Sequence, residues 1–277
     1  MKVKIYFVIA LLSSFIVASS FADPVEDNKI IKTYFADIFP NIVFEEYVNG
    51  VYAIDENSRS QWLDIEEFPP YEEAIEAGEI LFTTPFKNGA SYADCFENGG
   101  IGIKQNYPYF DTDRSQVITL ELALNECRQQ HGEQPLSYGK GDIAYLSSYM
   151  AATSKDKLIH VTVPNEPAAL AAYEEGKQFF YARRGQLNMA CATCHVSSAG
   201  KRLRADILSP ALGQTSHFPA YRFKWDDVGT IQRRYDGCNT QIRAKPFKLQ
   251  SEQYRNLEYF HTHMSNGLPI NGPGTRK

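Results

Sequence analysis

Residues 191–195 read Cys191-Ala192-Thr193-Cys194-His195. Two thiols at this spacing match the two vinyl groups of one porphyrin, and the histidine that follows places an imidazole under the iron. A zinc knuckle or a redox-active cysteine pair is the alternative interpretation, but the sequence has no second Cys/His pair at zinc spacing. The motif therefore predicts one covalently bound haem c, attached to Cys191 and Cys194, with His195 as an axial iron ligand.

The first residues have the order of a secretory signal peptide. Lys2 and Lys4 precede an apolar run from Ile5 to Val17, and small residues end at Ala22. The run is too short to span a bilayer comfortably, and no later segment is long enough to form a membrane span. Because haem c is attached outside the energy-coupling membrane, we expect cleavage after Ala22 and a soluble protein in the bacterial periplasm.

Composition indicates a folded globular chain, since 22% of the 277 residues are charged and 43% are hydrophobic. The net charge of −5 is unevenly distributed. Between Lys201 and Lys248 there are ten Lys/Arg residues and four Asp/Glu residues. A basic segment that follows the haem motif in an acidic chain favours a small anionic ligand, and we expect no nucleic-acid partner.

Two halves of the chain resemble each other. Glu76–Phe82 precedes Cys95 much as Glu174–Phe180 precedes the haem motif, and aromatic-rich helical patterns end the halves at Ile143–Met150 and Tyr254–Met264. Helix, loop and aromatic closing helix is the order of a small cytochrome c domain. The repeat predicts a mainly α fold with two cytochrome c-like domains. The N-terminal domain would have no haem, because its loop lacks a second cysteine and a histidine.

Pro-rich and polar segments mark the predicted boundaries, before residue 71 and between the halves. The predicted organisation is a signal peptide (1–22), an N-terminal extension (23–70), a haem-less cytochrome c-like domain (71–160), a linker (161–167) and a haem-binding cytochrome c domain (168–277).

Five cysteines is an odd number for an exported protein. Cys95 and Cys127 lie in the haem-less domain, where an oxidising compartment favours a disulfide over two free buried thiols. Cys238 then remains unpaired. Two arginines, Arg233 and Arg234, precede it, and guanidinium charge favours the thiolate form of a nearby cysteine. Since a thiolate also ligates haem iron, we predict that Cys238 is the reactive centre and the distal ligand.

Other side chains are alternative candidates for the distal iron ligand. Met264 would give the ligation of an ordinary electron carrier, although a methionine on an aromatic-rich helix more often packs in a core. One of His261 and His263 is a further candidate and His217 is a weak one, whereas Met189 is too close to Cys191 to reach round the ring, and His131 and His160 belong to the other domain. A plain periplasmic electron-transfer cytochrome and a haem-bearing structural subunit are accordingly the alternative functions.

Several short motifs extend over nearly the whole mature chain. They are Tyr92–Phe96, Gly99–Ile103, Leu120–Cys127, the haem motif, Arg234–Cys238 and Asn266–Pro269. Together they resemble the SoxA family, whose members are the catalytic cytochrome subunits of the SoxAX complex. The resemblance implies an L-cysteine S-thiosulfotransferase that joins thiosulfate to a cysteine of SoxY, in the SoxYZ carrier, as cysteine S-thiosulfonate. It also implies a heterodimer with the SoxX cytochrome, to which electrons pass.

The same resemblance implies roles for individual residues. Cys191 and Cys194 would bind haem, His195 would be one axial ligand, and Cys238, commonly a persulfide in the family, would be the other. Arg234, four residues before that cysteine, would bind substrate. Two-haem relatives carry another haem motif in the N-terminal domain, so this chain resembles the single-haem branch, in which a disulfide replaces that haem.

Overall fold

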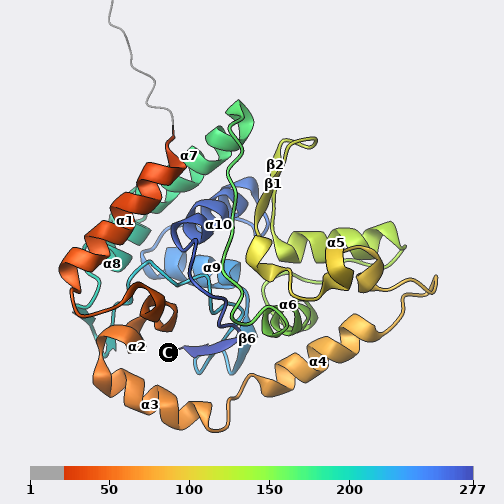
Figure 1. Ribbon diagram of the computed structural model, residues 1–277, viewed down its shortest axis with the longest axis horizontal. Helices are drawn as coiled ribbons and strands as arrows, with labels where there is room; N and C mark the ends of the chain where they lie inside the picture. Colours follow the sequence, from red (N-terminus) through yellow and green to blue (C-terminus); the bar gives the residue numbers. More distant parts are fainter. Residues whose placement is uncertain (1–21, 277) are drawn as a thin grey trace, which may run out of the picture.

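Residues 22–276, the part of the chain that the computed structural model describes, form two mainly helical lobes with separate hydrophobic cores (Figure 1). The expected signal peptide lies outside these residues, except for Ala22. Within residues 22–276, every helix is too short or too polar to cross a membrane. The mainly α architecture predicted from the sequence is confirmed.

The first lobe runs from α4 (Glu72–Thr83) to α6 (Asp142–Ala152), which contains the predicted aromatic-rich helix. Between them lie three 3-10 helices, a β-hairpin and one further helix. These elements are η2 (Tyr92–Asp94), η3 (Glu97–Gly100), η4 (Lys104–Asn106), β1 (Tyr109–Asp111), β2 (Gln116–Ile118) and α5 (Leu120–Gln130). The core joins α4, α5 and α6 through residues such as Phe82, Leu124 and Met150.

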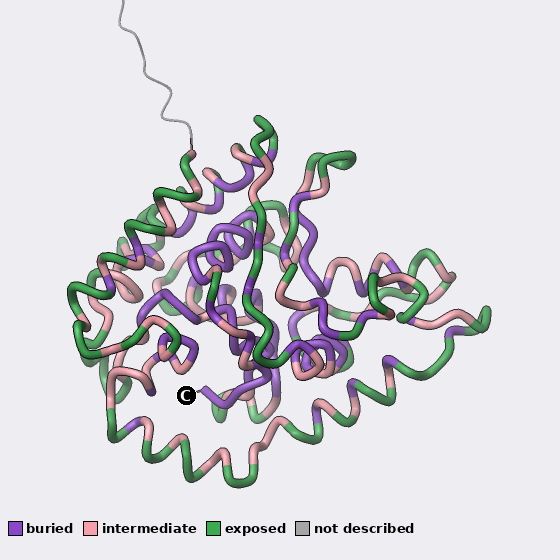
Figure 2. The backbone as a smooth tube through the Cα atoms, viewed as in Figure 1, coloured by how far each residue is buried: buried purple, intermediate pink, exposed green. Residues whose placement is uncertain are grey.

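The second lobe runs from α7 (Pro167–Tyr181) to α10 (Glu252–Met264) and ends in strand β7 (Gly274–Arg276). The intervening elements are α8 (Cys191–His195), β3 (Arg202–Leu203), β4 (Asp206–Ile207), β5 (Ala220–Arg222), β6 (Asp227–Gly229) and α9 (Ile231–Gln241). Strand β5 lies at the centre of a three-stranded sheet, antiparallel to β6 and parallel to β7. Helix α10 is buried from Asn256 to Met264 (Figure 2).

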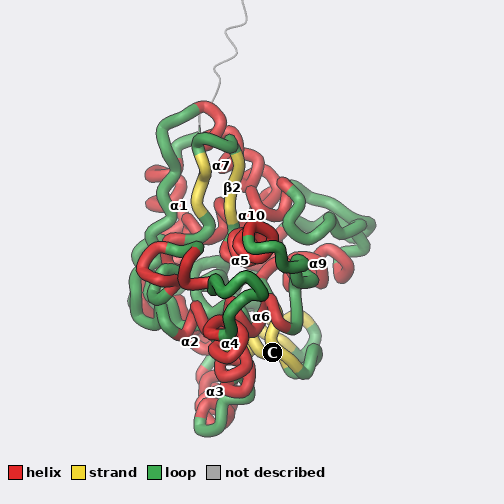
Figure 3. Tube along the Cα trace, turned by 90° about the vertical axis from the view of Figure 1, so that its right-hand side faces the viewer, coloured by secondary structure: helices red, strands yellow, loops and turns green. Residues whose placement is uncertain are grey.

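The two lobes repeat the same order of elements, beyond what the sequence comparison indicated. In each, an antiparallel hairpin (β1–β2 or β5–β6) leads through a threonine N-cap, Thr119 or Thr230, into a helix of eleven residues. Each threonine lies eight positions before a cysteine, Cys127 or Cys238, and both pairs are 111 positions apart in the chain. Figure 3 shows the β1–β2 hairpin beside α7 and α10, where the first lobe contacts the second.

A glycine at the main helix crossing also repeats. A Cβ on Gly78 of α4 would lie 2.0 Å from the carbonyl oxygen of Tyr145 in α6. A Cβ on Gly176 of α7 would lie 2.0 Å from the carbonyl oxygen of Asn256 in α10. Both crossings therefore bring two helix backbones closer than any side chain allows, and glycine is required at this one position in each lobe.

The N-terminal extension covers the second lobe and not the first, although the first follows it in the chain. It consists of α1 (Pro24–Ile38), η1 (Phe44–Asn49), α2 (Val51–Ile54) and α3 (Glu56–Glu66). Asp27 of α1 pairs with Lys177 of α7 at 2.6 Å, and Phe35 is fully buried in the core of the second lobe. In Figure 1, α1 lies along α7 at the edge of the molecule. The extension is thus part of the second lobe's structure.

Candidate active site

Helix α8 presents the side chains of the haem motif. The His195 Nδ1 lies 3.0 Å from the carbonyl oxygen of Ser209, and the side-chain amide of Gln214 is 2.7 Å from the same nitrogen. Burial lowers the pKa of His195 to about 4, so the imidazole is neutral at pH 7. The two neighbours require opposite roles of Nδ1, because the Ser209 carbonyl only accepts and the Gln214 amide nitrogen only donates; when Ser209 accepts, the proton is on Nδ1 and the Nε2 lone pair is left for iron. The residues present therefore fit an axial ligand.

The three cysteines outside the disulfide are partly buried free thiols. Burial first, and then the charge of Cys238, raises the pKa of Cys191 to about 12. Burial and the charge of Cys238 likewise raise the pKa of Cys194, while Arg234 acts in the opposite direction. The folded chain therefore brings Cys238, on α9, into the electrostatic neighbourhood of both thiols of the haem motif, although more than forty residues separate them in sequence.

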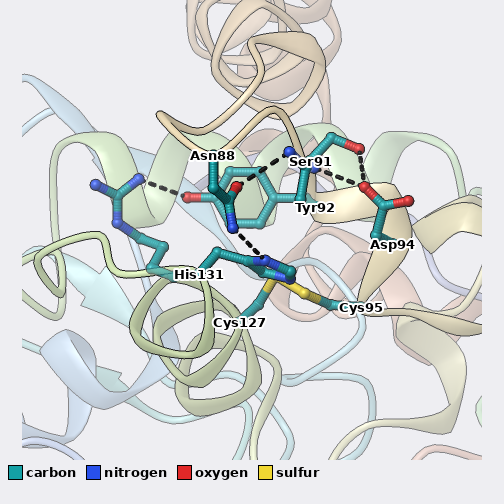
Figure 4. The surroundings of a disulfide bond; sticks show 9 residues. Asn88, Ser91, Tyr92, Asp94, Cys95, Cys127 and His131 are labelled. Carbon is teal, nitrogen blue, oxygen red and sulfur yellow. Dashed lines mark hydrogen bonds between the residues drawn. A yellow bond between two sulfur atoms is a disulfide. The ribbon is translucent and has the colours of Figure 1, made fainter.

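In the first lobe, the cysteines at the corresponding places are joined by a covalent bond. Cys95, in the loop that corresponds to the haem motif, forms a disulfide with Cys127 of α5, with a Cα–Cα distance of 5.8 Å (Figure 4). Cys127 and Cys238 occupy equivalent places on equivalent helices. Helices α5 and α9 thus each direct a cysteine toward the loop of their own lobe.

Hydrogen bonds and stacking hold the disulfide's surroundings in place. The His131 Nδ1 lies 3.0 Å from the Asn88 amide nitrogen, and the amide N–H of Ser91 donates to Asp94 at 2.7 Å (Figure 4). His131 also lies close to the disulfide, since one of its ring nitrogens and the Sγ atoms of Cys95 and Cys127 lie within 4.8 Å of one another. Because both sulfurs are used in the disulfide, this cluster offers no thiolate ligand in the oxidised chain.

Two arginines carry the positive charge beside Cys238. Arg234 lies one helical turn before Cys238 on α9, and its charge lowers the pKa values of Cys194 and Arg222. Arg222, at the end of β5, is partly buried, and burial followed by the charge of Arg234 lowers its pKa to about 10. The charge of Cys238 acts on the pKa of Arg222 in the opposite direction, so the Arg222 guanidinium lies within electrostatic range of both Arg234 and this sulfur. The arrangement suits a small anion with more than one negative charge.

Known proteins share this architecture and sequence. The family described as "SoxA/TsdA, cytochrome c domain" matches residues 77–159 and 175–270. The chain is 54% identical over 257 residues to the L-cysteine S-thiosulfotransferase subunit SoxA of Allochromatium vinosum, covering 92% of this chain and 91% of that protein. The chain belongs to the SoxA family. The SoxA subunit of Chlorobaculum tepidum is also 54% identical, over 251 residues that cover 91% of this chain and 87% of the relative.

A solved structure agrees with the SoxA assignment. The crystal structure of SoxXA from P. pantotrophus matches with a TM-score of 0.72 and 28% identity, over 79% of this chain and 84% of that chain. Two cytochrome c-like domain segments, as the sequence predicts, are therefore established for this SoxA-family chain.

Sequence reasoning missed Arg222. It lies sixteen positions before Cys238, in a strand, and reaches the site because β5 pairs with β6 and β7. Two other arginines of the basic segment are placed differently: Arg233 stacks on Trp225 at 4.3 Å, and Arg243 is exposed. The one signal that could have pointed to a cation at the strand end is the hairpin that leads directly into the cysteine-bearing helix α9.

Four alternative distal ligands lie in the second lobe of this SoxA-family fold, and one of them, His261, is within electrostatic range of His195 and has a buried Nε2 with no hydrogen-bond partner among the described residues. Met264 is 1% exposed in the core of the second lobe, and His217 is buried with its Nδ1 3.1 Å from the carbonyl oxygen of Gly213. The ring of His263 packs against Tyr173 at 5.2 Å. His261 contacts the Tyr235 hydroxyl through Nδ1 at 2.9 Å, and burial lowers its pKa to about 3. Each of these side chains has a packing or hydrogen-bonding role in its own surroundings.

Proposed function

We propose that this chain catalyses the oxidative conjugation of thiosulfate to a cysteine of the carrier protein SoxY, giving cysteine S-thiosulfonate. The observation that carries the proposal is the convergence of Cys238 with Cys191, Cys194, Arg234 and Arg222. A plain electron carrier needs neither a free cysteine nor two arginines beside its haem motif. The names of its relatives, L-cysteine S-thiosulfotransferase subunits, support the same reaction.

In this proposal, Cys191 and Cys194 of the second lobe would hold one haem c covalently, and His195 and Cys238 would ligate its iron. The neutral imidazole of His195 and the free thiols fit this group. The first lobe holds none, because its only candidate thiols are joined as a disulfide. When bound, the haem supplies the one-electron acceptor that an oxidation of sulfur requires.

The protein's own residues bind and orient the anion. Arg234 and Arg222 together offer two positive charges to a dianion, and a guanidinium matches a sulfonate group with two parallel hydrogen bonds. The Cys238 sulfur then forms an S–S bond with the outer sulfur of thiosulfate, which releases one proton to solvent and two electrons that would pass one at a time to the SoxX cytochrome. A carrier cysteine thiolate attacks that outer sulfur, takes over the thiosulfonate group and frees the Cys238 thiolate. No further electrons move in this second step.

The proposed partners and location follow from the same family. The match to the crystal structure of SoxXA supports a heterodimer with the cytochrome SoxX, and SoxY of SoxYZ is the protein substrate. The export signal at the N-terminus and the haem motif support the periplasm. The domain limits 71–160 and 168–277 remain proposals, with the addition that residues 23–70 belong to the fold of the second lobe.

The test is turnover of purified holo-complex with thiosulfate and SoxYZ. Cys238→Ser should abolish conjugation, and unchanged turnover in this variant would exclude Cys238 as the reactive group. Arg222→Gln removes a charged partner worth about 1.5–3 kcal/mol, so kcat/KM for thiosulfate should fall roughly 10- to 100-fold with haem still attached. Arg202→Gln, which removes an exposed cation from β3, is the matched control and should change kcat/KM little.

A further inference from the structure

Two carboxyl groups are buried where the lobes meet. Glu121 of α5, in the first lobe, is 4% exposed, and Glu258 of α10, in the second, is 6% exposed. Neither takes part in an ion pair within residues 22–276. Buried carboxylates without a cationic partner are costly, so this pair requires a chemical explanation.

The pair lies at equivalent positions of the repeat. The Ser147 hydroxyl donates to Glu121 Oε1 at 2.8 Å, and the Gln232 amide nitrogen donates to Glu258 Oε2 at 2.8 Å. Positions 121 and 232, and positions 147 and 258, are each 111 residues apart. Both lobes thus keep the same hydrogen bond between their last two helices, but the carboxyl group is on the first helix of one pair and on the second helix of the other.

The network fixes the donors and joins the lobes. The Gln232 side-chain oxygen accepts from the amide N–H of Gln250 at 2.7 Å, so its nitrogen must face Glu258. The Gln250 side-chain oxygen in turn accepts from the hydroxyl of Thr119, the N-cap of α5, at 2.8 Å. Each carboxyl group therefore receives one neutral donor from its own lobe and keeps an oxygen for a further partner.

A small enclosed cavity lies between these groups. It has a volume of about 10 Å³, and the residues that line it include Glu121, Glu258, Lys104, Tyr107 and Thr215. This is close to the space that one water molecule needs. The Thr215 hydroxyl is buried, with 6% of the residue exposed, and has no hydrogen-bond partner among the residues described. An unsatisfied hydroxyl facing a polar cavity indicates a small hydrogen-bonding occupant.

The two carboxyl groups at the cavity outnumber the cations that face them. Burial first, and then the negative charge of Glu121, raises the pKa of Glu258, while Gln232 and Lys104 lower it. Burial raises the pKa of Tyr107 and of Tyr235, so both phenols are neutral at pH 7. Tyr138, beyond α5, also has a raised pKa, mainly through burial. One lysine thus faces two carboxyl groups.

We propose that this cavity is an internal proton-binding site, in which Glu258 is held as the carboxylic acid and one water molecule links it to Glu121 and Thr215. Glu121 lies in the first turn of α5, where the helix dipole favours an anion. The joint between the lobes therefore contains one titratable proton, and raising the pH removes it and places two like charges together.

Binding of this proton makes the stability of the fold depend on pH in a measurable way. The folded protein keeps it at pH values where an unfolded glutamate, with a pKa of about 4.3, has lost it. Stability from this group is therefore greatest below that pKa and is lost as pH rises toward the folded value. The unfolding equilibrium constant should rise up to tenfold per pH unit through this window. Glu258→Gln in the holo-protein keeps the shape and should remove that part of the pH dependence.

The matched control is Glu126→Gln. Glu126 lies on the same helix as Glu121, but its side chain is 35% exposed and pairs with Arg114. This variant should keep the wild-type dependence attributed to Glu258. Equal pH slopes for wild type and Glu258→Gln would overturn the proposal. The infrared spectrum of the wild type gives a second test that needs no variant: a carboxylic acid carbonyl band should be present at pH 7, and its absence would overturn the proposal even if Glu258→Gln does not fold.

Discussion

Gly176→Ala tests the helix crossing between α7 and α10 on which the second lobe depends. The new Cβ would lie 2.0 Å from the Asn256 carbonyl oxygen, 2.7 Å from its carbonyl carbon and 2.9 Å from the Cβ of Phe260. Ordinary contact begins at 3.4 Å, so α7 and α10 must separate by more than an ångström at this point (3.4 − 2.0 = 1.4 Å). The obstructing atoms are backbone, and they cannot move aside by a rotamer change.

The expected free-energy change follows from two opposing terms. Overpacking costs about 1–3 kcal/mol, and a backbone obstruction belongs at the upper end of that range. Alanine recovers about 1 kcal/mol relative to glycine in a helix interior. Gly176→Ala should therefore destabilise the second lobe by about 2 kcal/mol. Gly78→Ala meets the Tyr145 carbonyl oxygen at the same 2.0 Å and should destabilise the first lobe by a similar amount.

Thermal unfolding of the holo-protein, followed by the haem circular dichroism band and by far-ultraviolet ellipticity, separates the two lobes. The Gly176→Ala variant should lower the haem-reported midpoint by roughly 4–8 °C. Gly237→Ala in α9 is the control, because a Cβ there meets nothing within 4 Å. It should be neutral or stabilising by up to about 1 kcal/mol. A stable Gly176→Ala protein with an unchanged midpoint would refute the argument from close approach.

Two further outcomes are expected. Cys127→Ser removes the Cys95–Cys127 disulfide, whose sequence separation is 32, and should lower the stability of the first lobe by about 3–4 kcal/mol. The haem spectrum should not change, and an unchanged unfolding midpoint would contradict the prediction. His217→Gln should flatten the loss of stability in acid. Burial lowers the pKa of His217, so the unfolded chain binds a proton below about pH 6.5 that the folded chain does not, and stability falls with pH by up to about 1.4 kcal/mol per unit. Chemical denaturation between pH 5 and 7 should show that the variant takes up one proton fewer on unfolding than the wild type. Parallel plots of stability against pH for the two proteins would disprove this role of His217.

The sequence predicted the features whose signals are local. Five consecutive residues define the haem motif, and the aromatic periodicity located α6 and α10. The repeat around Gly78 and Gly176 indicated two similar domains, and the structure explains these glycines as crossing points. Each of these signals comes from neighbouring residues that form one element, so folding adds little to their interpretation.

Features that depend on pairing between distant segments were not predictable in the same way. Arg222 joins the site through the β5–β6–β7 sheet, and no spacing in the sequence relates a strand end to a cysteine on the next helix. The extension's position on the second lobe depends on contacts such as that between Asp27 and Lys177, 150 positions apart. The equivalence of α5 and α9 was hidden because the two helices share a threonine cap and a cysteine but little else.

That equivalence relates the disulfide to the proposed reactive centre. In both lobes, the helix after the hairpin directs a cysteine at the loop that follows the glycine-containing helix. In the first lobe the loop offers one thiol, and the two sulfurs bond to each other. In the second lobe the loop's two thiols are predicted to bind haem, so Cys238 has no sulfur partner among the described residues and is the proposed reactive group. The same backbone geometry therefore gives a structural crosslink in one lobe and a free, cation-flanked thiol in the other, and the difference lies in the number of thiols in the opposing loop.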